Sequence, residues 1–424
     1  MRRGFLLSTA ASDAAALWVG IVVGSLATFS RVLPWEAEPR IWFLITALNV
    51  GLLLGSWLSA RTWGNAIPRP TYGRALAIWT TMLLVSLAGI VVSRAYFSRP
   101  FLGIAIGVGI SLSFAHRFVR RRRPWSEPMI LVSSTKELVD DLAVAAHATV
   151  IDVIDPSGNP PEYQPPEGVS IVLDLRTVLS EAMSSWASSV TMAGYNMRAL
   201  TNVFEEHTGR LPMVHLAEGW ELSIPARRAE QYALLKRILD ITFSLLTIPL
   251  WVPLSLVTAV VIRLDSPGPA LFRQERIGQG GERFSLLKFR TMSVDAEKNG
   301  PQFAKENDER FTRLGPILRK IRLDEIPQMV NVLKGDLSLV GPRPEQAAFV
   351  EQFSKSIPFY DQRHIIRPGI TGWAQTLQGY AEDEDQTVEK LSYDLYYVKH
   401  MSLWLDIDII LRSVWTVLSG TGAR

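Results

Sequence analysis

Two adjacent carboxylates, Asp324 and Glu325, are the residues of this chain best suited to do chemistry. They stand in Leu323-Asp324-Glu325-Ile326-Pro327, where Asp324 is placed to cap a short helix that should run to Leu333 and stop at Gly335. Carboxylates at a helix N-terminus stay ionised because the helix dipole is positive there. Such a pair suits Mg²⁺, which combines one or two carboxylates with substrate phosphate oxygens. In isolation, the pair would be only a cap and a first-turn charge.

Positive charge surrounds these two carboxylates in the sequence. Three arginines precede them, and Gly341-Pro342-Arg343-Pro344 follows as a rigid loop that would present one guanidinium to a phosphate at little entropic cost. The candidate phosphate-binding and substrate-binding residues are Lys288, Arg319, Arg343, Arg363 and Arg367. Basic residues beside a membrane segment can also simply meet anionic headgroups. Their number around one carboxylate pair favours a phosphate-handling site.

Composition narrows the class of protein. The chain has 424 residues, enough for two or three domains, and 44 Lys+Arg against 41 Asp+Glu leave a net charge of only +3. That weak excess argues against a dedicated nucleic-acid-binding protein. The absence of cysteine excludes disulfides, zinc–thiolate sites and cysteine nucleophiles. A mean hydropathy of +0.14 is high for a soluble chain.

Four apolar segments open the chain, at residues 13–29, 41–60, 75–93 and 101–115. Each is long enough, or nearly so, to cross a hydrocarbon core about 30 Å thick. Ten arginines lie on one side of this layout and four on the other, which places the N-terminus and everything after Arg123 in the cytoplasm. Apart from Asp13 the segments carry no ionisable group, so they are interpreted as an anchor rather than a transport path. A soluble four-helix bundle is the disfavoured alternative.

Residues 128–222 alternate between strand-like and helix-like stretches. Strands are expected at 129–132, 150–154, 169–173 and 213–216, and helices at 138–146 and 180–203. This alternation predicts a small α/β domain in the dinucleotide-binding style. Ser133 and Ser134 stand where the phosphate-binding glycines of such a domain would be, so we interpret it as a scaffold or regulatory unit. Without that glycine loop, the reductase-like spacing of Tyr232 and Lys236 is attributed to chance.

A fifth apolar segment, residues 241–262, carries no charge over 22 residues and is long enough to span a membrane. Pro249 and Pro253 interrupt it, and each removes a backbone donor and kinks a helix. Both flanks are basic, which favours keeping both on the cytoplasmic side. A re-entrant helix over residues 237–263, broken at the two prolines, fits these observations better than a fifth crossing. The stretch 402–418 suits an amphipathic helix on the membrane surface about as well as a buried helix.

Seven sequence blocks in the second half of the chain occur in a recognisable order. They are Lys236-Arg237…Asp240, Asp265-Ser266…Gly268-Pro269, Lys288-Phe289-Arg290-Thr291-Met292, Leu323-Asp324-Glu325, Asn331-Val332-Leu333-Lys334-Gly335-Asp336, Gly341-Pro342-Arg343-Pro344 and Arg367-Pro368-Gly369-Ile370-Thr371-Gly372-Trp373. In this order they resemble the bacterial sugar transferases, the monotopic polyprenyl-phosphate phosphoglycosyl transferases, over residues 232–424. The N-terminal segments and the α/β domain resemble the large branch of that family, whose members start exopolysaccharide or O-antigen chains.

The resemblance implies a reaction. Asp324 would attack the sugar-bearing phosphorus of a UDP-hexose, with glucose or galactose expected, and expel UMP; polyprenyl (undecaprenyl) phosphate would then displace the aspartate. Mg²⁺ held through Glu325, Asp324 and the pyrophosphate would neutralise developing charge, while Arg319 and Arg343 clamp phosphoryl oxygens. Lys288 is an expected support. The expected setting is the bacterial inner (cytoplasmic) membrane, with the multi-pass chain in contact with its lipids and the catalytic domain on the cytoplasmic face. No nucleic acid is expected, and a homodimer is left open.

The predicted fold class is membrane α plus α/β. Residues 1–123 form a four-helix transmembrane anchor, residues 124–225 a degenerate Rossmann-like cytoplasmic domain, and residues 226–424 an α+β catalytic domain anchored by the re-entrant helix. The sequence departs from the family's pattern at two positions. Val252 replaces the serine of a Ser-Pro pair at the helix break, and Arg322 replaces a small polar residue.

Two functions from other classes stay open at this point. A membrane-bound nucleotide-sugar dehydratase would share the four spans and the α/β domain, but it needs the missing glycine loop. A non-catalytic polysaccharide assembly protein would have no use for the two adjacent carboxylates. Replacing Asp324 by Asn separates both from the transferase, because the isostere keeps the shape and loses the nucleophile.

Overall fold

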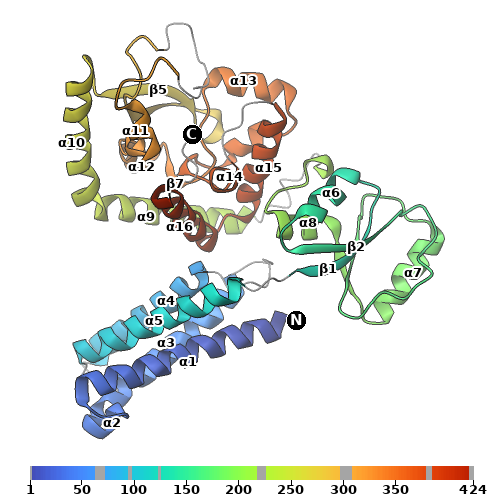
Figure 1. Cartoon of the computed structure of the whole chain (residues 1–424), viewed down its shortest axis with the longest axis horizontal. Helices are drawn as coiled ribbons and strands as arrows, with labels where there is room; N and C mark the ends of the chain where they lie inside the picture. Colours follow the sequence, from blue (N-terminus) through green and yellow to red (C-terminus); the bar gives the residue numbers. More distant parts are fainter. Residues whose placement is uncertain are drawn as a thin grey trace.

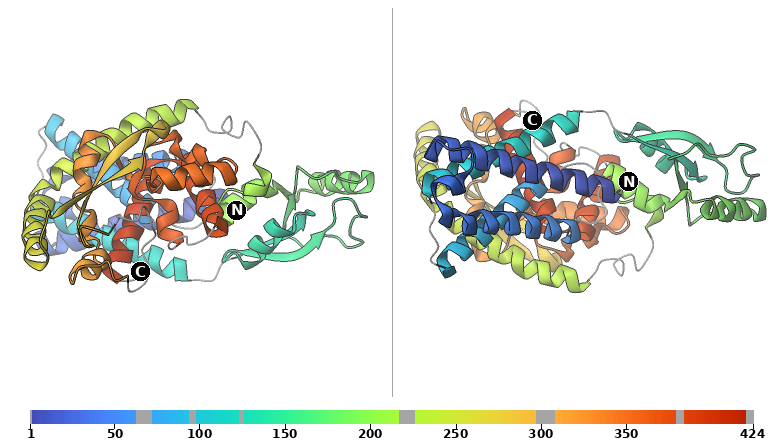
Figure 2. Two further views of the ribbon diagram at one scale, coloured as in Figure 1. Left: turned by 90° about the horizontal axis from the view of Figure 1, so that it is seen from above. Right: turned by 90° about the horizontal axis from the view of Figure 1, so that it is seen from below.

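Three parts follow one another along the chain (Figure 1). The computed structural model describes residues 2–62, 72–93, 98–122, 126–216, 226–296, 308–378 and 384–419. We call the parts the N-terminal bundle (residues 2–122), the parallel-sheet domain (126–216) and the C-terminal unit (226–419). In Figure 2 the parallel-sheet domain projects from one end of the molecule, beyond the other two parts.

All the regular secondary structure in the described residues of the N-terminal bundle is helical. Its helices are α1 (Arg2–Phe29), α2 (Pro34–Ala37), η1 (Pro39–Ile41), α3 (Trp42–Thr62), α4 (Tyr72–Ser93) and α5 (Arg99–Arg122). Five helices in the described part of the chain are long and apolar enough to cross a membrane, and the four long helices of this bundle are among them. Large apolar side chains such as Leu53, Leu84 and Val91 lie exposed on the outside of the bundle. Such a surface needs a lipid environment to cover it.

A buried ion pair joins α1 to α5. The two terminal nitrogens of Arg117 donate to the two carboxylate oxygens of Asp13 at 2.6 and 2.7 Å, and the Ser113 hydroxyl donates to the same carboxylate at 2.6 Å. A bidentate, fully hydrogen-bonded pair is the form in which charge is tolerated inside an apolar bundle. Asp13 lies near the start of the first span and Arg117 near the end of the fourth. The pair therefore links the N-terminal part of α1 to the C-terminal part of α5.

The parallel-sheet domain is a four-stranded sheet with helices packed against it. Its strands are β1 (Glu127–Val132), β2 (Ala148–Ile154), β3 (Ser170–Leu173) and β4 (Asn196–Ala199), all parallel in the order β2-β1-β3-β4. Its helices are α6 (Lys136–Val144), α7 (Glu181–Met192) and α8 (Leu200–Thr208). The strands β1 and β3 are buried, which matches their continuous apolar runs.

Two of the predicted elements in this domain are wrong. The stretch 180–203 is not one helix, because Gly194 takes a left-handed φ of +89° and turns the chain back to the sheet, where β4 pairs with β3. The stretch 213–216 is not a strand but a short 3₁₀ turn, Met213–His215. Once β4 has filled the position beside β3, these residues leave the sheet and contact the C-terminal unit.

The C-terminal unit begins with α9 (Ala226–Leu246), which is apolar only toward its C-terminal end, and the apolar α10 (Ile248–Asp265), and the two run in different directions (Figure 1). The backbone leaves the helical region at Thr247, with φ −92° and ψ 0°. Pro249 lies in the first turn of α10, and the helix continues through Pro253. The break therefore precedes both prolines, and Pro249 starts the second helix because a proline is tolerated there. Both helices expose large apolar side chains, such as Leu246 and Leu250.

The rest of the C-terminal unit is built from small sheets and short helices. An antiparallel pair joins β5 (Leu271–Ile277) to β6 (Arg283–Phe289), with a 3₁₀ turn (Gln279–Gly281) between them, and a short parallel pair joins β7 (Ser338–Val340) to β8 (Gly369–Thr371). The helices are α11 (Gly315–Lys320), α12 (Gln328–Lys334), α13 (Ala347–Ser356), α14 (Trp373–Leu377), α15 (Glu384–His400) and α16 (Leu403–Ser419), with 3₁₀ turns η5 (Leu323–Glu325) and η6 (Tyr360–Ile365).

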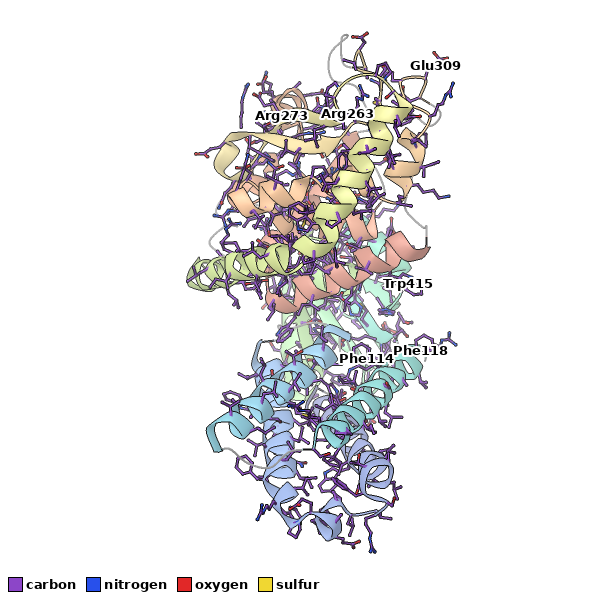
Figure 3. The ribbon with its side chains drawn as sticks, turned by 90° about the vertical axis from the view of Figure 1, so that its left-hand side faces the viewer. Phe114, Phe118, Arg263, Arg273, Glu309 and Trp415 are labelled. Atoms are coloured by element: carbon purple, nitrogen blue, oxygen red, sulfur yellow. The ribbon has the colours of Figure 1, made fainter. Side chains whose placement is uncertain are left out.

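One buried carboxylate ties α16 to α9. Asp406 accepts hydrogen bonds from Lys236 Nζ at 2.5 Å, from the Tyr232 hydroxyl at 2.6 Å and from the Tyr397 hydroxyl at 2.5 Å. Tyr232 and Lys236, one turn apart on α9, thus both reach one carboxylate, which is a structural role and not that of a reductase site. On the opposite face of α16, Trp415 is 70% exposed on the side nearest the N-terminal bundle (Figure 3). The helix has one packed face and one exposed apolar face, so it is not wholly buried.

We expect Asp406→Asn to destabilise the protein far more than Asp408→Asn on the same helix. The first change leaves the buried Lys236 ammonium without its directly bonded counter-charge, a loss of about 3 kcal/mol. The second breaks a pair with Arg412 one turn away near the surface, worth only about 0.5 kcal/mol. Thermal unfolding of the detergent-solubilised chain measures both. Equal shifts in Tm would show that Asp406 does not hold α16 to α9.

Candidate active site

Asp324 and Glu325 lie together in the 3₁₀ turn η5, between α11 and α12. Arg322, just before them, adopts the left-handed conformation with φ +55° and ψ +25°. The amides of Glu325 and Ile326 then bond to the carbonyls three residues back, at 3.3 Å each. A non-glycine residue in this conformation is strained, and such strain collects at functional sites. The turn places two carboxylates side by side at a fixed angle.

The prediction that Asp324 caps the following helix is wrong. The helix α12 begins at Gln328, with Pro327 at its N-cap position, so its first free amides lie beyond the reach of an Asp324 cap. The amides of Glu325 and Ile326 are engaged in 3₁₀ bonds, so no α-helix begins at Asp324. The predicted end is confirmed: α12 stops at Gly335, which has a φ of +101°.

Glu325 is the anchor of the local charge network. Arg343 donates to one of its carboxylate oxygens at 3.1 Å, and Arg322 lies 3.4 Å from the other. Burial alone would raise the pKa of Glu325, but Arg343, Lys288 and Arg322 outweigh burial and lower the pKa to about 2. Glu325 is therefore ionised across the physiological pH range.

Asp324 has the opposite electrostatic character. Its side chain is buried, and within the described residues it makes no hydrogen bond or ion pair with another side chain. Burial and the negative charge of Glu325 raise the pKa of Asp324 to about 6, although Lys288, Arg319 and Arg343 pull it down. At neutral pH it is an ionised carboxylate held by charge at a distance rather than by direct bonds. That is the state a nucleophile needs.

Two of the cations around Asp324 come from neighbouring elements. Lys288 on β6 is half-buried; burial and the nearby Arg343 and Arg276 guanidinium groups lower its pKa to about 7. Arg319 on α11 is oriented by a hydrogen bond from its Nε to the Thr291 hydroxyl at 3.2 Å. Its guanidinium also stacks on the Phe311 ring, 4.7 Å from the centroid. Both cations are placed to receive an anion beside Asp324.

Arg363 lies behind the Arg343 loop instead of facing the carboxylates. Its guanidinium is 3% exposed and donates to Asp394 at 2.7 Å and to the backbone carbonyl of Arg343 at 2.9 Å. Arg276 supports the same loop from β5, donating to the Pro344 carbonyl at 3.0 Å. These bonds fix the backbone from which the Arg343 side chain reaches Glu325.

Arg367 lies beside the same loop through its backbone. A Cβ on Gly341 would stand 2.4 Å from the Arg367 carbonyl oxygen, so only glycine permits this approach. Arg367 is not among the groups with the largest effects on the pKa of Asp324 or Glu325. The structure thus gathers three of the five predicted phosphate ligands, Lys288, Arg319 and Arg343, around the carboxylates and leaves the other two beneath or beside the loop.

Three residues that shape the site were missed in the sequence. Phe311 stacks on Arg319, Asp394 pairs with Arg363, and Glu345 pairs with Lys390 at 2.5 Å. Burial would raise the pKa of Glu345, but its basic neighbours, Lys390 first among them, lower it to about 2. Its position directly after Gly-Pro-Arg-Pro was the available signal. Phe311 and Asp394 lie outside the recognisable blocks.

The two carboxylates could supply some, but not all, of the ligands of a divalent cation. In the described residues no cluster of three or more His, Cys, Asp or Glu side chains could hold a metal. Asp324 has its oxygens uncommitted to hydrogen bonds, and its raised pKa reflects a negative charge that a cation would offset. Two adjacent carboxylates are what Mg²⁺ uses when phosphate oxygens supply its further ligands. The residues present therefore fit a cation that arrives with a phosphorylated substrate.

Asp324→Asn should stabilise the protein near pH 7. Ionised Asp324 destabilises the fold because its pKa rises from 3.8 to about 6, and the amide removes a cost of about 3 kcal/mol. The gain should vanish below pH 4, where the acid is protonated in both the folded and the unfolded chain. Glu325→Gln is the control: its pKa is lowered, so its charge stabilises the fold and the amide should destabilise it near pH 7. A loss of stability in Asp324→Asn at neutral pH would contradict the assigned charge state.

A family model described as bacterial sugar transferase matches residues 231–420, which include all the candidate site residues. A UDP-N-acetylgalactosamine-undecaprenyl-phosphate N-acetylgalactosaminephosphotransferase of Aeromonas hydrophila is 46% identical over 259 residues, which cover 60% of this chain and 60% of that protein. The chain thus spans less than two thirds of that relative.

Two further relatives are matched over more of their length. A UDP-glucose:undecaprenyl-phosphate glucose-1-phosphate transferase of Caulobacter vibrioides is 45% identical over 192 residues, 44% of this chain and 71% of the relative. An exopolysaccharide production protein of Rhizobium leguminosarum bv. phaseoli is 40% identical over 191 residues, 44% of this chain and 96% of the relative. With the ordered blocks and the charge cluster around Asp324, these matches show that the chain belongs to the bacterial sugar transferase family.

Proposed function

We propose that this protein transfers a sugar 1-phosphate from a UDP-sugar to undecaprenyl phosphate and releases UMP. The observation that supports this most directly is Asp324, a buried carboxylate with a pKa of about 6 among Lys288, Arg319 and Arg343. The names of the relatives support the substrate class, because they act on undecaprenyl phosphate with either glucose or N-acetylgalactosamine. We therefore propose a UDP-hexose or UDP-N-acetylhexosamine as donor.

In the first step an Asp324 oxygen attacks the phosphorus that bears the sugar. A phosphorus–oxygen bond to Asp324 forms, the bond to the bridging oxygen of the diphosphate breaks, and UMP leaves with that oxygen. The phosphoryl oxygens carry the charge of this transition state. Arg343 and Arg319 bind those oxygens, and Lys288, with its pKa lowered to about 7, can donate a proton or a hydrogen bond to the leaving phosphate.

In the second step a phosphate oxygen of undecaprenyl phosphate attacks the same phosphorus. Asp324 leaves as a carboxylate, and the product is a sugar linked to the lipid through a diphosphate. Two steps let one site serve a water-soluble donor and a lipid acceptor in turn. The exposed apolar helices α9 and α10 begin the same unit and would enter the membrane as a re-entrant pair, which brings the site to the depth of the lipid phosphate.

We further propose a Mg²⁺ ion and a cytoplasmic orientation. Asp324 and Glu325 would hold the ion together with the donor's diphosphate, and the bound ion would neutralise charge on the leaving phosphate. The arginine asymmetry of the four N-terminal spans favours the cytoplasmic side of the bacterial inner membrane for the C-terminal unit.

Asp324→Asn should abolish UMP release, with a loss of about three orders of magnitude or more, because the amide keeps the shape and lacks the nucleophile. The measurement is UMP formed from a panel of UDP-sugars by purified protein with Mg²⁺ and undecaprenyl phosphate. Asp361→Asn is the control, since Asp361 is exposed on η6 and accepts a hydrogen bond from the Ser354 hydroxyl on that surface. Equal UMP release by wild type and Asp324→Asn would exclude Asp324 as the nucleophile.

UMP release should also rise with pH through about 6. Because the ionised form of Asp324 is the reactive one, lowering the pH below its raised pKa protonates it, and kcat should fall about tenfold per pH unit. Rates measured between pH 5 and 8 under saturating donor test this. A rate that stays flat from pH 5 to 7, with chemistry limiting, would contradict the raised pKa.

A further inference from the structure

Trp373 connects the parallel-sheet domain to the C-terminal unit. Its indole N–H donates to the backbone carbonyl of Gly209, at the end of α8, at 2.8 Å. Gly209 has a φ of +67°, and a Cβ there would lie 3.0 Å from the indole ring. The indole also packs against the Tyr396 ring, at 6.0 Å between centroids, and under the Arg412 guanidinium at 5.2 Å. Little freedom is left to this side chain, which is 9% exposed.

Charged pairs hold α8 of the parallel-sheet domain against α15. Glu205 accepts a hydrogen bond from Lys399 at 2.8 Å and pairs with His400 at 2.7 Å. Arg210 donates to Glu389 at 3.1 Å. The two elements lie side by side where the domain meets the C-terminal unit (Figure 1). The contact between Gly209 and Trp373 therefore sits inside a fixed interface.

Trp373 directly follows Gly372, and Gly372 contacts the loop that carries Arg343. A Cβ on Gly372 would stand 2.3 Å from the Gly341 carbonyl oxygen, so the two backbones are in direct contact. The Gly341 amide donates to the Thr371 carbonyl in β8 at 2.8 Å. The Gly369 amide donates to the carbonyl of Pro342, the residue just before Arg343, at 2.9 Å. A continuous series of backbone contacts therefore connects Trp373 to Arg343, the arginine that binds Glu325.

We propose that Trp373 is a positioning residue through which the parallel-sheet domain holds Arg343 in place. The proposal deepens the proposed function, since it rests on Arg343 as a phosphate ligand. A displaced indole shifts Gly372, loosens the pair of β7 and β8 and weakens the hold of Arg343 on Glu325. The 191 matched residues fill 96% of the Rhizobium relative, which leaves that protein no room for both other parts. The contact through Trp373 would thus be a feature of chains that carry the parallel-sheet domain.

The test compares Gly209→Ala with Gly194→Ala in the full chain. Both glycines are left-handed residues of the same domain, so both alanines strain the backbone similarly, but a Cβ on Gly194 has no atom within 4 Å. Trp373→Phe keeps a ring and removes the N–H. Gly209→Ala and Trp373→Phe should each speed hydrogen exchange of the Gly341 and Gly369 amides by about fivefold, the loss expected for one hydrogen bond. Gly194→Ala should leave both amides unchanged.

Transfer kinetics provide a second readout. The kcat for UMP release should fall about fivefold in Gly209→Ala and in Trp373→Phe, and the double variant should be no slower than the worse single one, since both cut one connection.

Unchanged exchange at Gly341 and Gly369 in Gly209→Ala would overturn the proposal, as would an equal effect of Gly194→Ala. A wild-type protein that releases no UMP would instead refute the proposed function, and the exchange comparison would still decide whether Trp373 holds the loop.

Discussion

The ion pair between the buried Glu325 and the half-buried Arg343 is the interaction on which the rest of the site depends. It keeps one carboxylate ionised and fixed, and that fixed charge makes the neighbouring Asp324 harder to ionise. Two adjacent carboxylates with pKa values pushed apart can take different roles, one as structural anion and one as reactive group. The 3₁₀ turn with left-handed Arg322 keeps the two side chains together.

Neighbouring elements hold the backbone of the loop that carries Arg343. Arg363 and Arg276 bind the backbone of the Arg343 loop, and β7 and β8 pair on either side of it. Asp240 on α9 accepts from the Ser338 hydroxyl and the Leu339 amide at the start of the same segment. Helix α9 is therefore joined to the segment that leads into the Arg343 loop by buried polar bonds. Such bonds hold α9 and the charged site at a constant distance.

The sequence predicted which residues belong to the site better than it predicted the position and role of each. Lys288, Arg319 and Arg343 could be named because they stand in dense, ordered blocks, and the structure gathers them around the carboxylates. The place of Arg363 depends on Asp394, 31 residues away, and the role of Tyr232 and Lys236 on Asp406, about 170 residues away. No local pattern encodes such partners. The short β4 and the 3₁₀ turn of Asp324 were likewise decided by tertiary pairing and by single left-handed residues.

The central claim is that Asp324 carries the sugar phosphate between donor and acceptor. Mass spectrometry of the purified protein, mixed with a UDP-sugar and Mg²⁺ but no undecaprenyl phosphate, tests it most directly. The account predicts an added sugar phosphate on the peptide that contains Asp324, lost when undecaprenyl phosphate is supplied and absent from Asp324→Asn. Turnover to UMP with acceptor present, with no adduct on that peptide in its absence, would contradict a covalent intermediate at Asp324.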